Sequence, residues 1–205
     1  QPDMQAFPPA LLDPLTMVIA EPCLLKIPGE DIPSGSVHQL VETEIMKEED
    51  YEYAYEEGYI QLLLKLLPKL RPNVPEVREK FLADIESASR LFRSNVERLK
   101  ELGIPCYAGG GMESPFGLLS MMRSYEKFCL DLYRNPDIVA STVEKFTEDL
   151  AQLAITACKL VGIPRALIGL HRECSSFFSL KQFEEIGLPE IKKLVSLLSR
   201  EGITP

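Results

Sequence analysis

The sequence lacks long apolar runs and an excess of basic residues, and each absence excludes a class of protein. No window approaches the ~20 consecutive apolar residues that a membrane-spanning helix needs. No basic segment followed by an apolar one indicates a signal peptide. Acidic side chains number 31 against 22 basic ones, for a net charge of -9. This balance argues against nucleic acids and anionic membrane surfaces as partners.

The sequence also lacks a paired-cysteine pattern. Its five cysteines are odd in number and include no Cys-x-x-Cys pair, so they form no disulfide framework. We therefore expect a reducing compartment and a cytoplasmic protein. The chain begins at Gln1 rather than methionine, from which we expect further residues upstream. Its 205 residues, 45% hydrophobic and 26% charged, suffice for one buried domain or for part of a larger one.

The N-terminal part carries short apolar runs and then a strongly acidic stretch. The runs Leu15–Ala20 and Leu24–Ile27 predict a short strand before a turn at Pro28-Gly29. From Glu42 to Glu57 there are eight acids against one base, and tyrosines are interleaved with them or follow directly. The stretch is either a site for a cation or basic partner, or a solvated helix face whose tyrosines lie on the core. We favour the second interpretation, because acid runs are most often solvated.

Three long helices are predicted further along the chain. Pro75 opens the first, whose apolar stripe runs from Val77 to Leu102. Asn135 and Pro136 begin the second, with a stripe of Val139, Val143, Phe146, Leu150, Leu153, Ala157 and Leu160. Ser179 begins the third, and Gln182 completes a capping box with it. Pro189 is then expected to break or kink this third helix.

The ends of these helices repeat a pattern: each has a glycine, then isoleucine, then a proline close by, at Gly103, Gly162 and Gly202. The first two lead into short apolar runs, Cys106–Ala108 and Ala166–Leu170, which we predict to be strands. Helix, glycine stop, short strand and loop is the order typical of a parallel sheet with crossover helices. The third leads to Pro205, where we expect another strand to begin.

In parallel barrels the active site lies on the loops that follow the strands, and the first such loop here is Gly109–Pro115. Backbone amides of Gly110 and Gly111 can approach a ligand closely, and the helix start near Pro115 can face an anion. Gly110, Gly111, Glu113 and Phe116 are therefore candidate substrate-binding residues. The segment matches neither the dinucleotide-binding nor the Walker pattern, so a tight turn is an equal alternative.

The second loop, His171–Ser179, brings together an imidazole, a guanidinium, a carboxylate and a thiol. Arg172 can clamp a substrate carboxylate, and Glu173 or His171 can act as acid or base. These three are the candidate catalytic residues. His171 and Cys174 make only half of a structural zinc site, so no metal site is predicted within the chain. The alternative is a local ion pair between Arg172 and Glu173, with Cys174 as a packed small residue.

Three segments, through their order and spacing, carry a family resemblance. They are Pro115–Ser120 (PFGLLS), Leu130–Val139 (LDLYRNPDIV) and Phe178–Phe183 (FSLKQF), the last followed by Leu188-Pro189. The chain from Pro28 to Pro205 resembles the uroporphyrinogen decarboxylase superfamily. That group also contains the cobalamin-dependent methyltransferases that act on corrinoid proteins, coenzyme M or tetrahydrofolate. The resemblance implies an α/β fold, a (β/α)8 TIM barrel present only in part, as one incomplete domain over residues 1–205.

The decarboxylase branch of this superfamily implies residues that the chain does not match. Its tyrosine falls at Met121, which we add to the substrate-binding candidates, and its serine falls near Glu173. Its early aspartate has only Glu21 as a counterpart, and we expect its arginine-rich N-terminal motif, if present, upstream of Gln1. The resemblance therefore favours a methyltransferase over a tetrapyrrole decarboxylase. A third interpretation is a non-catalytic interaction module that uses the acidic face Glu42–Glu57.

The methyltransferase branch implies particular partners. They are a small-molecule substrate and a methylcobamide delivered by a corrinoid protein; a homodimer stays an open alternative. Some members also bind zinc through a His-x-Cys pair, which would lie beyond Pro205 here. Such a zinc ion would activate a thiol acceptor by stabilising its thiolate. No metal ligands are expected within this chain.

Overall fold

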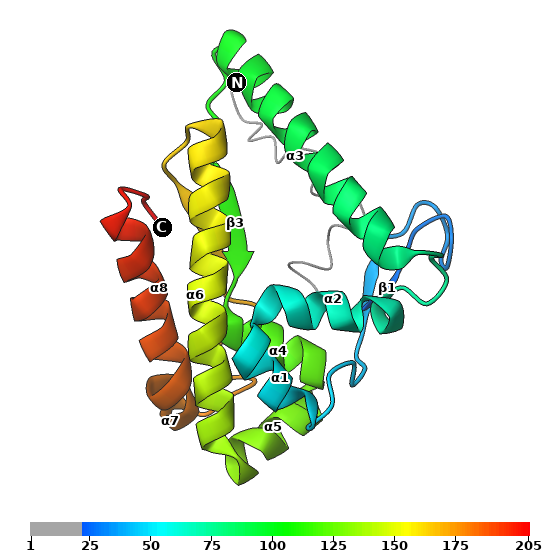
Figure 1. The fold of residues 1–205 in the computed structure, drawn as a ribbon, viewed down its shortest axis with the longest axis vertical. Coiled ribbons are helices and arrows are strands. Elements are labelled where there is room, and N and C mark those ends of the chain that lie inside the picture. The colour runs from blue at the N-terminus through cyan, green and yellow to red at the C-terminus, as the bar shows by residue number, and fades with distance from the viewer. Residues whose placement is uncertain (1–21) are drawn as a thin grey trace.

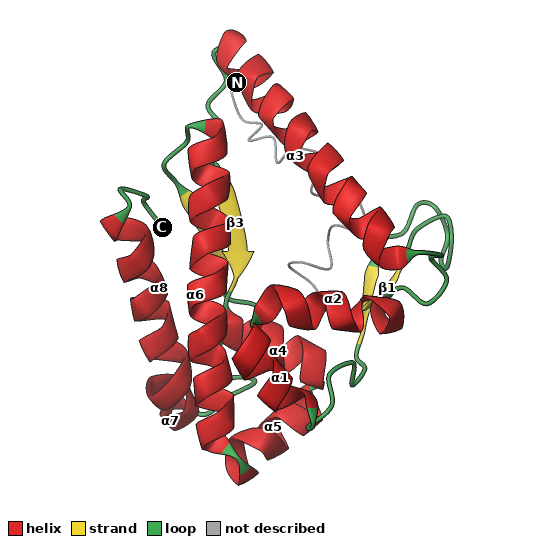
Figure 2. Cartoon of the chain, in the orientation of Figure 1, coloured by secondary structure: helices red, strands yellow, loops and turns green. Residues whose placement is uncertain are grey.

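The computed structural model describes residues 22–205, in which long helices are joined by short strands (Figures 1 and 2). The predicted strand at Leu15–Ala20 and the position of Glu21 lie outside the described residues. In chain order the elements are β1 (Leu24–Lys26), β2 (Gln39–Val41), α1 (Asp50–Glu57), α2 (Tyr59–Leu70), α3 (Val77–Glu101), β3 (Gly110–Glu113), α4 (Pro115–Arg123), α5 (Tyr125–Arg134), α6 (Pro136–Val161), β4 (Ala166–Gly169), α7 (Leu180–Gln182), a π-helical turn (Phe183–Gly187) and α8 (Leu188–Arg200).

Two strands lie parallel at the centre of the fold. β3 pairs with β4 in the register Gly110↔Ala166 to Glu113↔Gly169, and α6 packs along them with α8 beside it (Figure 1). A parallel bridge joins Arg165 to Thr204 on the other side of β4, where we expected a further strand to begin. The alternation of parallel strands and helices is compatible with the predicted α/β class. The part of the chain described by the structure contains no closed barrel.

The first parallel strand lies later in the sequence than predicted. The expected strand at Cys106–Ala108 is wrong, because β3 is formed by Gly110–Glu113, which we had assigned to a loop. Three successive glycines argued against a strand, since glycine has low strand propensity. Packing against α6 overrides that propensity: a Cβ on Gly110 would lie 3.0 Å from the Ala154 carbonyl oxygen and 3.1 Å from the Ala157 Cβ. The second predicted strand is confirmed as β4, one residue shorter.

The close approach of α6 to β3 gives a prediction for two neighbouring glycines. Gly110→Ala is expected to lower the free energy of unfolding by about 1 to 3 kcal/mol, because α6 must move to admit the methyl group. Gly111→Ala is the matched control, since its Cβ would meet Leu167 only at 3.4 Å or more. Urea unfolding of both variants measures the difference. Equal stability of the two variants would contradict this account of the packing.

The predicted helix ends are confirmed. Gly103, Gly162 and Gly202 all adopt the left-handed conformation, with φ of 68°, 68° and 71°. The predicted stripe of α6 is confirmed as far as Leu150. Beyond it the buried positions are Ala151, Ala154, Ile155, Cys158 and Val161, whereas Leu153 and Leu160 are 40% and 48% exposed. The stripe shifts there because α6 places Ala154 and Cys158 against Gly110 of β3.

The third helix follows its predicted start and then changes its winding. Ser179 and Gln182 form the expected capping box. In place of the expected break, Phe183–Gly187 forms a π turn. This turn leads directly into α8, which has Pro189 in its first turn. Proline has no N–H for the preceding helical turn, and the π turn accommodates this without breaking the helix. Among the described residues, none of the helices is both long enough and apolar enough to cross a membrane.

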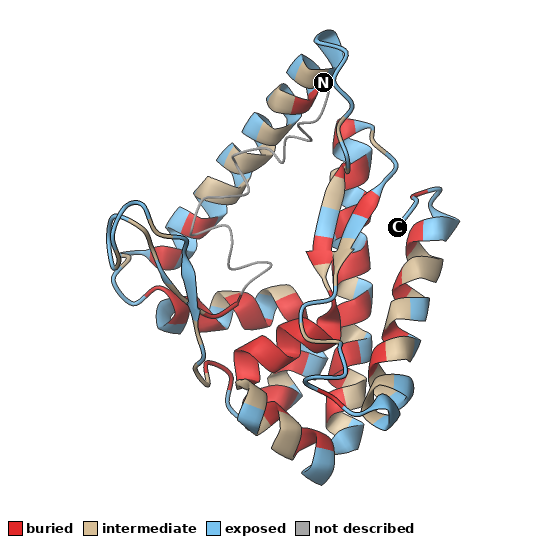
Figure 3. Cartoon of the chain, turned by 180° about the vertical axis from the view of Figure 1, so that it is seen from behind, coloured by how far each residue is buried: buried red, intermediate tan, exposed pale blue. Residues whose placement is uncertain are grey.

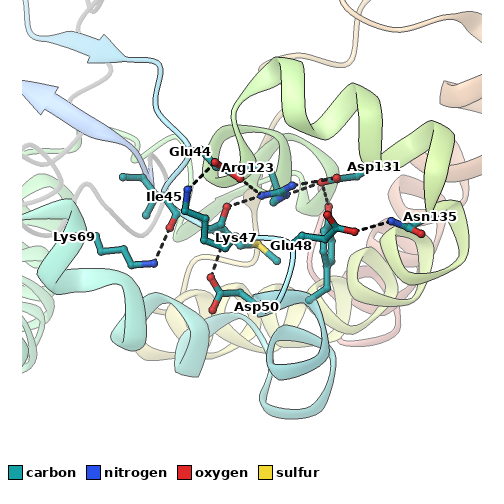
Figure 4. A network of polar contacts seen from close by, with 11 residues as sticks. Glu44, Ile45, Lys47, Glu48, Asp50, Lys69, Arg123, Asp131 and Asn135 are labelled. Atoms are coloured by element: carbon teal, nitrogen blue, oxygen red, sulfur yellow. Dashed lines mark hydrogen bonds and ion pairs between the residues drawn. The ribbon is translucent and has the colours of Figure 1, made fainter.

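The acidic stretch is only partly solvated, because several of its carboxylates pair with basic residues inside the fold. Arg123 at the end of α4 donates to Glu44 at 2.7 Å and to Asp131 of α5 at 2.6 Å (Figure 4). Asp50, only 4% exposed, pairs with Lys65 at 2.7 Å. The solvated-face interpretation is therefore wrong for these acids, but it holds for the exposed Glu49, Glu52, Glu56 and Glu57. Tyr51 and Tyr59 lie in the core as expected, whereas Tyr55 is 50% exposed.

Candidate functional site

The carboxyl ends of β3 and β4 meet at the start of α4, a helix buried along its whole length (Figure 3). Ser114 links β3 to α4, and its amide donates to the Gly169 carbonyl at 2.9 Å. Its side chain caps α4 by accepting from the Gly117 amide at 2.9 Å. Pro115 occupies the first helical turn, as predicted. Sequence and register thus place the end of each strand beside one helix N-terminus.

The loop His171–Ser179, which follows β4, is fixed against this helix start by aromatic contacts. The ring of Tyr125 lies 5.4 Å from that of Phe177 and 5.7 Å from that of Phe178, both edge-to-face. Phe178 is buried and also packs edge-to-face on Phe116 at 4.7 Å. Edge-to-face pairs contribute about 0.5 to 1.5 kcal/mol each beyond their buried area. These contacts therefore anchor the Phe177-Phe178 end of the loop beside α4 and α5.

Three glutamates gather at this point, and we call Glu113, Glu173 and Glu190 the strand-end carboxyl cluster. The Ser114 hydroxyl donates to the Glu173 carboxylate. Glu190, from the first turn of α8, accepts from the Phe116 amide at 2.8 Å. The Glu113 carboxylate lies over Gly169, where no room remains for a Cβ. The groups come from the end of β3, the loop after β4 and the start of α8.

The surroundings of two of these glutamates, Glu173 and Glu190, favour the protonated forms. Burial, followed by the negative charge of Glu173, raises the pKa of Glu190 well above its ordinary value of 4.5. Glu190 is 4% exposed, and its Oε1 has no hydrogen-bond partner among the described residues. Burial also raises the pKa of Glu173; backbone amides oppose this shift and the charge of Glu113 adds to it. A carboxyl pair in such surroundings retains a proton more readily than two solvated carboxylates.

The start of α4 is where a ligand anion was expected, and the chain's own side chains fill the place. A helix N-terminus attracts negative charge through its free amides and its dipole. Here the Phe116 amide is bound by Glu190 and the Gly117 amide by Ser114. The arrangement can exchange a proton at Glu173, and it leaves neither of these two amides for a ligand carboxylate.

Arg172 does not form an ion pair with Glu173, so the local pair predicted as the alternative to a catalytic role is wrong. Its guanidinium pairs instead with Glu42, with Nη2 and Oε2 2.6 Å apart, and it also donates to the Ser120 carbonyl at 3.3 Å. The side chain of Arg172 is 16% exposed. To clamp a substrate carboxylate, as predicted, it must exchange Glu42 for the substrate.

The remaining predicted site residues are spread over different surroundings. Phe116 and Met121 are 0% and 3% exposed, and Gly110 faces α6. Gly111 and His171 are exposed. The structure brings Glu113 and Glu173 together, with Arg172 next in sequence. The substrate-binding and catalytic roles of all these residues stay predictions.

The metal alternative finds no support in the described residues. Cys174 is exposed rather than packed, contrary to the second interpretation of its loop. Within residues 22–205, no group of three or more His, Cys, Asp or Glu side chains is arranged to hold a metal ion. His171 and Cys174 are therefore not part of a wider set of ligands in this region.

Two residues of the site were not predicted from the sequence. Ser114 had a usable signal, because a serine directly before a proline is typical of a helix N-cap followed by the first helical residue. Glu190 had none, since its partner amide lies 74 residues away. Only the packing of α8 beside α6 brings the two together.

Comparison with known families gives one match. A family model described as uroporphyrinogen decarboxylase (URO-D) matches residues 68–205. This region contains β3, β4, α4 and the whole strand-end carboxyl cluster. No curated protein and no solved structure matches the chain significantly.

Proposed function

The chain belongs to the uroporphyrinogen decarboxylase family, and from this membership we propose that it is a methyltransferase that draws its methyl group from a corrinoid. The strand-end carboxyl cluster is the observation that supports this choice over decarboxylation of uroporphyrinogen. Its members Glu173 and Glu190 both contact the start of α4, directly or through Ser114. The proposal therefore depends on what kind of substrate such a cluster accepts.

A porphyrinogen that carries several carboxylates needs cationic or amide donors to hold them. The cluster offers carboxyl groups instead, and the nearby Arg172 already pairs with Glu42. The Phe116 and Gly117 amides are also bound by the chain's own side chains, and a carboxylate taken out of water without donors is costly. A neutral methyl acceptor meets no such cost. Methyl transfer is thus the activity within this family that the hydrogen-bonding groups of the site favour.

The proposed donor is a methylcobamide, delivered by a corrinoid protein. Family members that use a thiol acceptor can bind zinc, which stabilises the thiolate. The described residues include no cluster suited to a metal ion, so we assign no step to zinc. What this chain's own residues supply is the placement of the acceptor at the strand ends and a carboxylate for its proton.

The proposal is tested by incubating the full chain with methylcobalamin and a series of thiol and amine acceptors. The corrinoid absorbance is followed under anaerobic conditions, and turnover of uroporphyrinogen is measured in parallel by chromatography. We expect demethylation of the corrinoid with at least one acceptor and no loss of carboxyl groups from uroporphyrinogen. The reverse outcome would identify a decarboxylase. Activity in neither assay would favour the interaction module.

A further inference from the structure

We propose that Glu173 accepts the proton released by the methyl acceptor, that Ser114 orients its carboxylate and that Glu190 is a positioning residue behind it. The attacking heteroatom of the acceptor then carries its proton until it attacks. This inference rests on the proposed methyl transfer and assigns the residue that takes the proton at that site.

The position of Glu173 suits a residue that touches substrate. It follows β4, at the end of the strand where parallel folds of this kind place their chemistry, and it is partly exposed. The Ser114 hydroxyl donates to its carboxylate. A Cβ on Gly117 would lie 3.4 and 3.5 Å from the two carboxylate oxygens. The carboxylate is therefore held against the first turn of α4 while the residue remains accessible.

Glu190 occupies the buried side of the same helix start. One carboxyl oxygen accepts from the Phe116 amide at 2.8 Å, and the other has no hydrogen-bond partner in the described part of the chain. Burial and the charge of Glu173 raise the pKa of Glu190 well above its ordinary value, which favours the protonated form of Glu190 behind Glu173. It fixes the start of α4, and with it Ser114, without repelling the Glu173 carboxylate.

Burial also makes Glu173 a better base than a solvated carboxylate, because its pKa is raised. In the reaction, the lone pair of the acceptor heteroatom attacks the methyl carbon of methyl-Co(III). The carbon–heteroatom bond forms as the cobalt–carbon bond breaks, and the bonding pair stays on the metal as Co(I). The proton of the heteroatom passes to the Glu173 carboxylate and then to solvent. Charge and atoms balance without a further reactant.

The test compares the pH profile of methylcobalamin demethylation in the wild type, Glu173→Gln and Glu173→Asp. The matched control is Glu184→Gln, which alters an exposed glutamate outside the cluster. We expect Glu173→Gln to lower kcat by about 10²-fold or more and to remove the acidic limb of the profile. Glu173→Asp should restore part of the rate and the limb, and Glu184→Gln should match the wild type.

A second readout is independent of turnover. Infrared titration of the folded chain should show a carboxyl band that titrates above the ordinary range and is lost in Glu173→Gln. A wild-type rate, profile and infrared titration in Glu173→Gln would overturn the proton role alone. A wild type that demethylates methylcobalamin with no acceptor at any pH would overturn the proposed function, and the proton role with it.

Discussion

Replacement of Arg123 by alanine is expected to lower the free energy of unfolding by about 3 to 5 kcal/mol. The Arg123 side chain is 2% exposed and donates through two nitrogens to Asp131, whose side chain is 6% exposed. It also donates to Glu44 and to the Met46 carbonyl, each at 2.7 Å (Figure 4). Without the guanidinium, the buried Asp131 carboxylate retains only the Tyr51 hydroxyl, at 2.8 Å, among these partners. An uncompensated buried charge is far more costly than the loss of a surface pair.

Guanidinium chloride unfolding followed by circular dichroism measures this effect. The matched control is Arg90→Ala, which removes an ion pair with Glu86 whose two side chains are 67% and 74% exposed. The control should change stability by no more than about 0.5 kcal/mol, because exposed helical pairs contribute little. If Arg123→Ala loses no more stability than the control, the Arg123 network does not hold α4, α5 and the acidic stretch together.

Glu190→Gln is expected to be more stable than the wild type near neutral pH, by an amount that grows as the pH rises. The folded chain raises the pKa of Glu190 well above 4.5, so above that pH the folded state binds more protons than the unfolded state. The wild type therefore loses stability from about pH 4.5 up to the raised pKa, by at most about 1.4 kcal/mol per pH unit. Glutamine cannot ionise, and it can still accept from the Phe116 amide.

Denaturant unfolding from about pH 4.5 to 8 checks this, with Glu184→Gln as the exposed control. Ionisation of Glu173 also lowers the stability as the pH rises, because its pKa is also raised. This contribution is present in the wild type and in both variants. The difference between Glu190→Gln and the wild type should widen with pH, whereas the control should follow the wild type. A difference that stays constant or narrows would show that Glu190 is not kept protonated by the fold.

Local features of this chain are predictable because their causes lie within a few residues. The helix ends depend on backbone conformation and hydrogen bonds within one helical turn. This holds for the glycine ends at Gly103, Gly162 and Gly202 and for the capping box of Ser179. β3 was misplaced because its glycines have low strand propensity, and only α6, more than 40 residues later, makes their small size useful.

The residues of the site show the same difference between local and distant causes. That Glu113 and Glu173 lie close together could be expected, because the ends of parallel strands share one edge of the sheet, although the strand before Glu113 was misplaced and Glu113 is itself the last residue of β3. The partner of Arg172 could not, because Glu42 lies 130 residues away. The same holds for Glu190, which meets Phe116 only when α8 packs beside α6. The sequence shows the chemistry of each residue, but it does not show which distant segments lie close together in the fold.

The central claim is that the carboxyl cluster serves methyl transfer to a neutral acceptor and rejects a polyanion. The most direct measurement is the rate of methylcobalamin demethylation by the full chain as uroporphyrinogen is added in increasing amounts. The account predicts a rate that does not change and uroporphyrinogen that keeps all its carboxyl groups. Competitive inhibition, or decarboxylation of the added porphyrinogen, would contradict it.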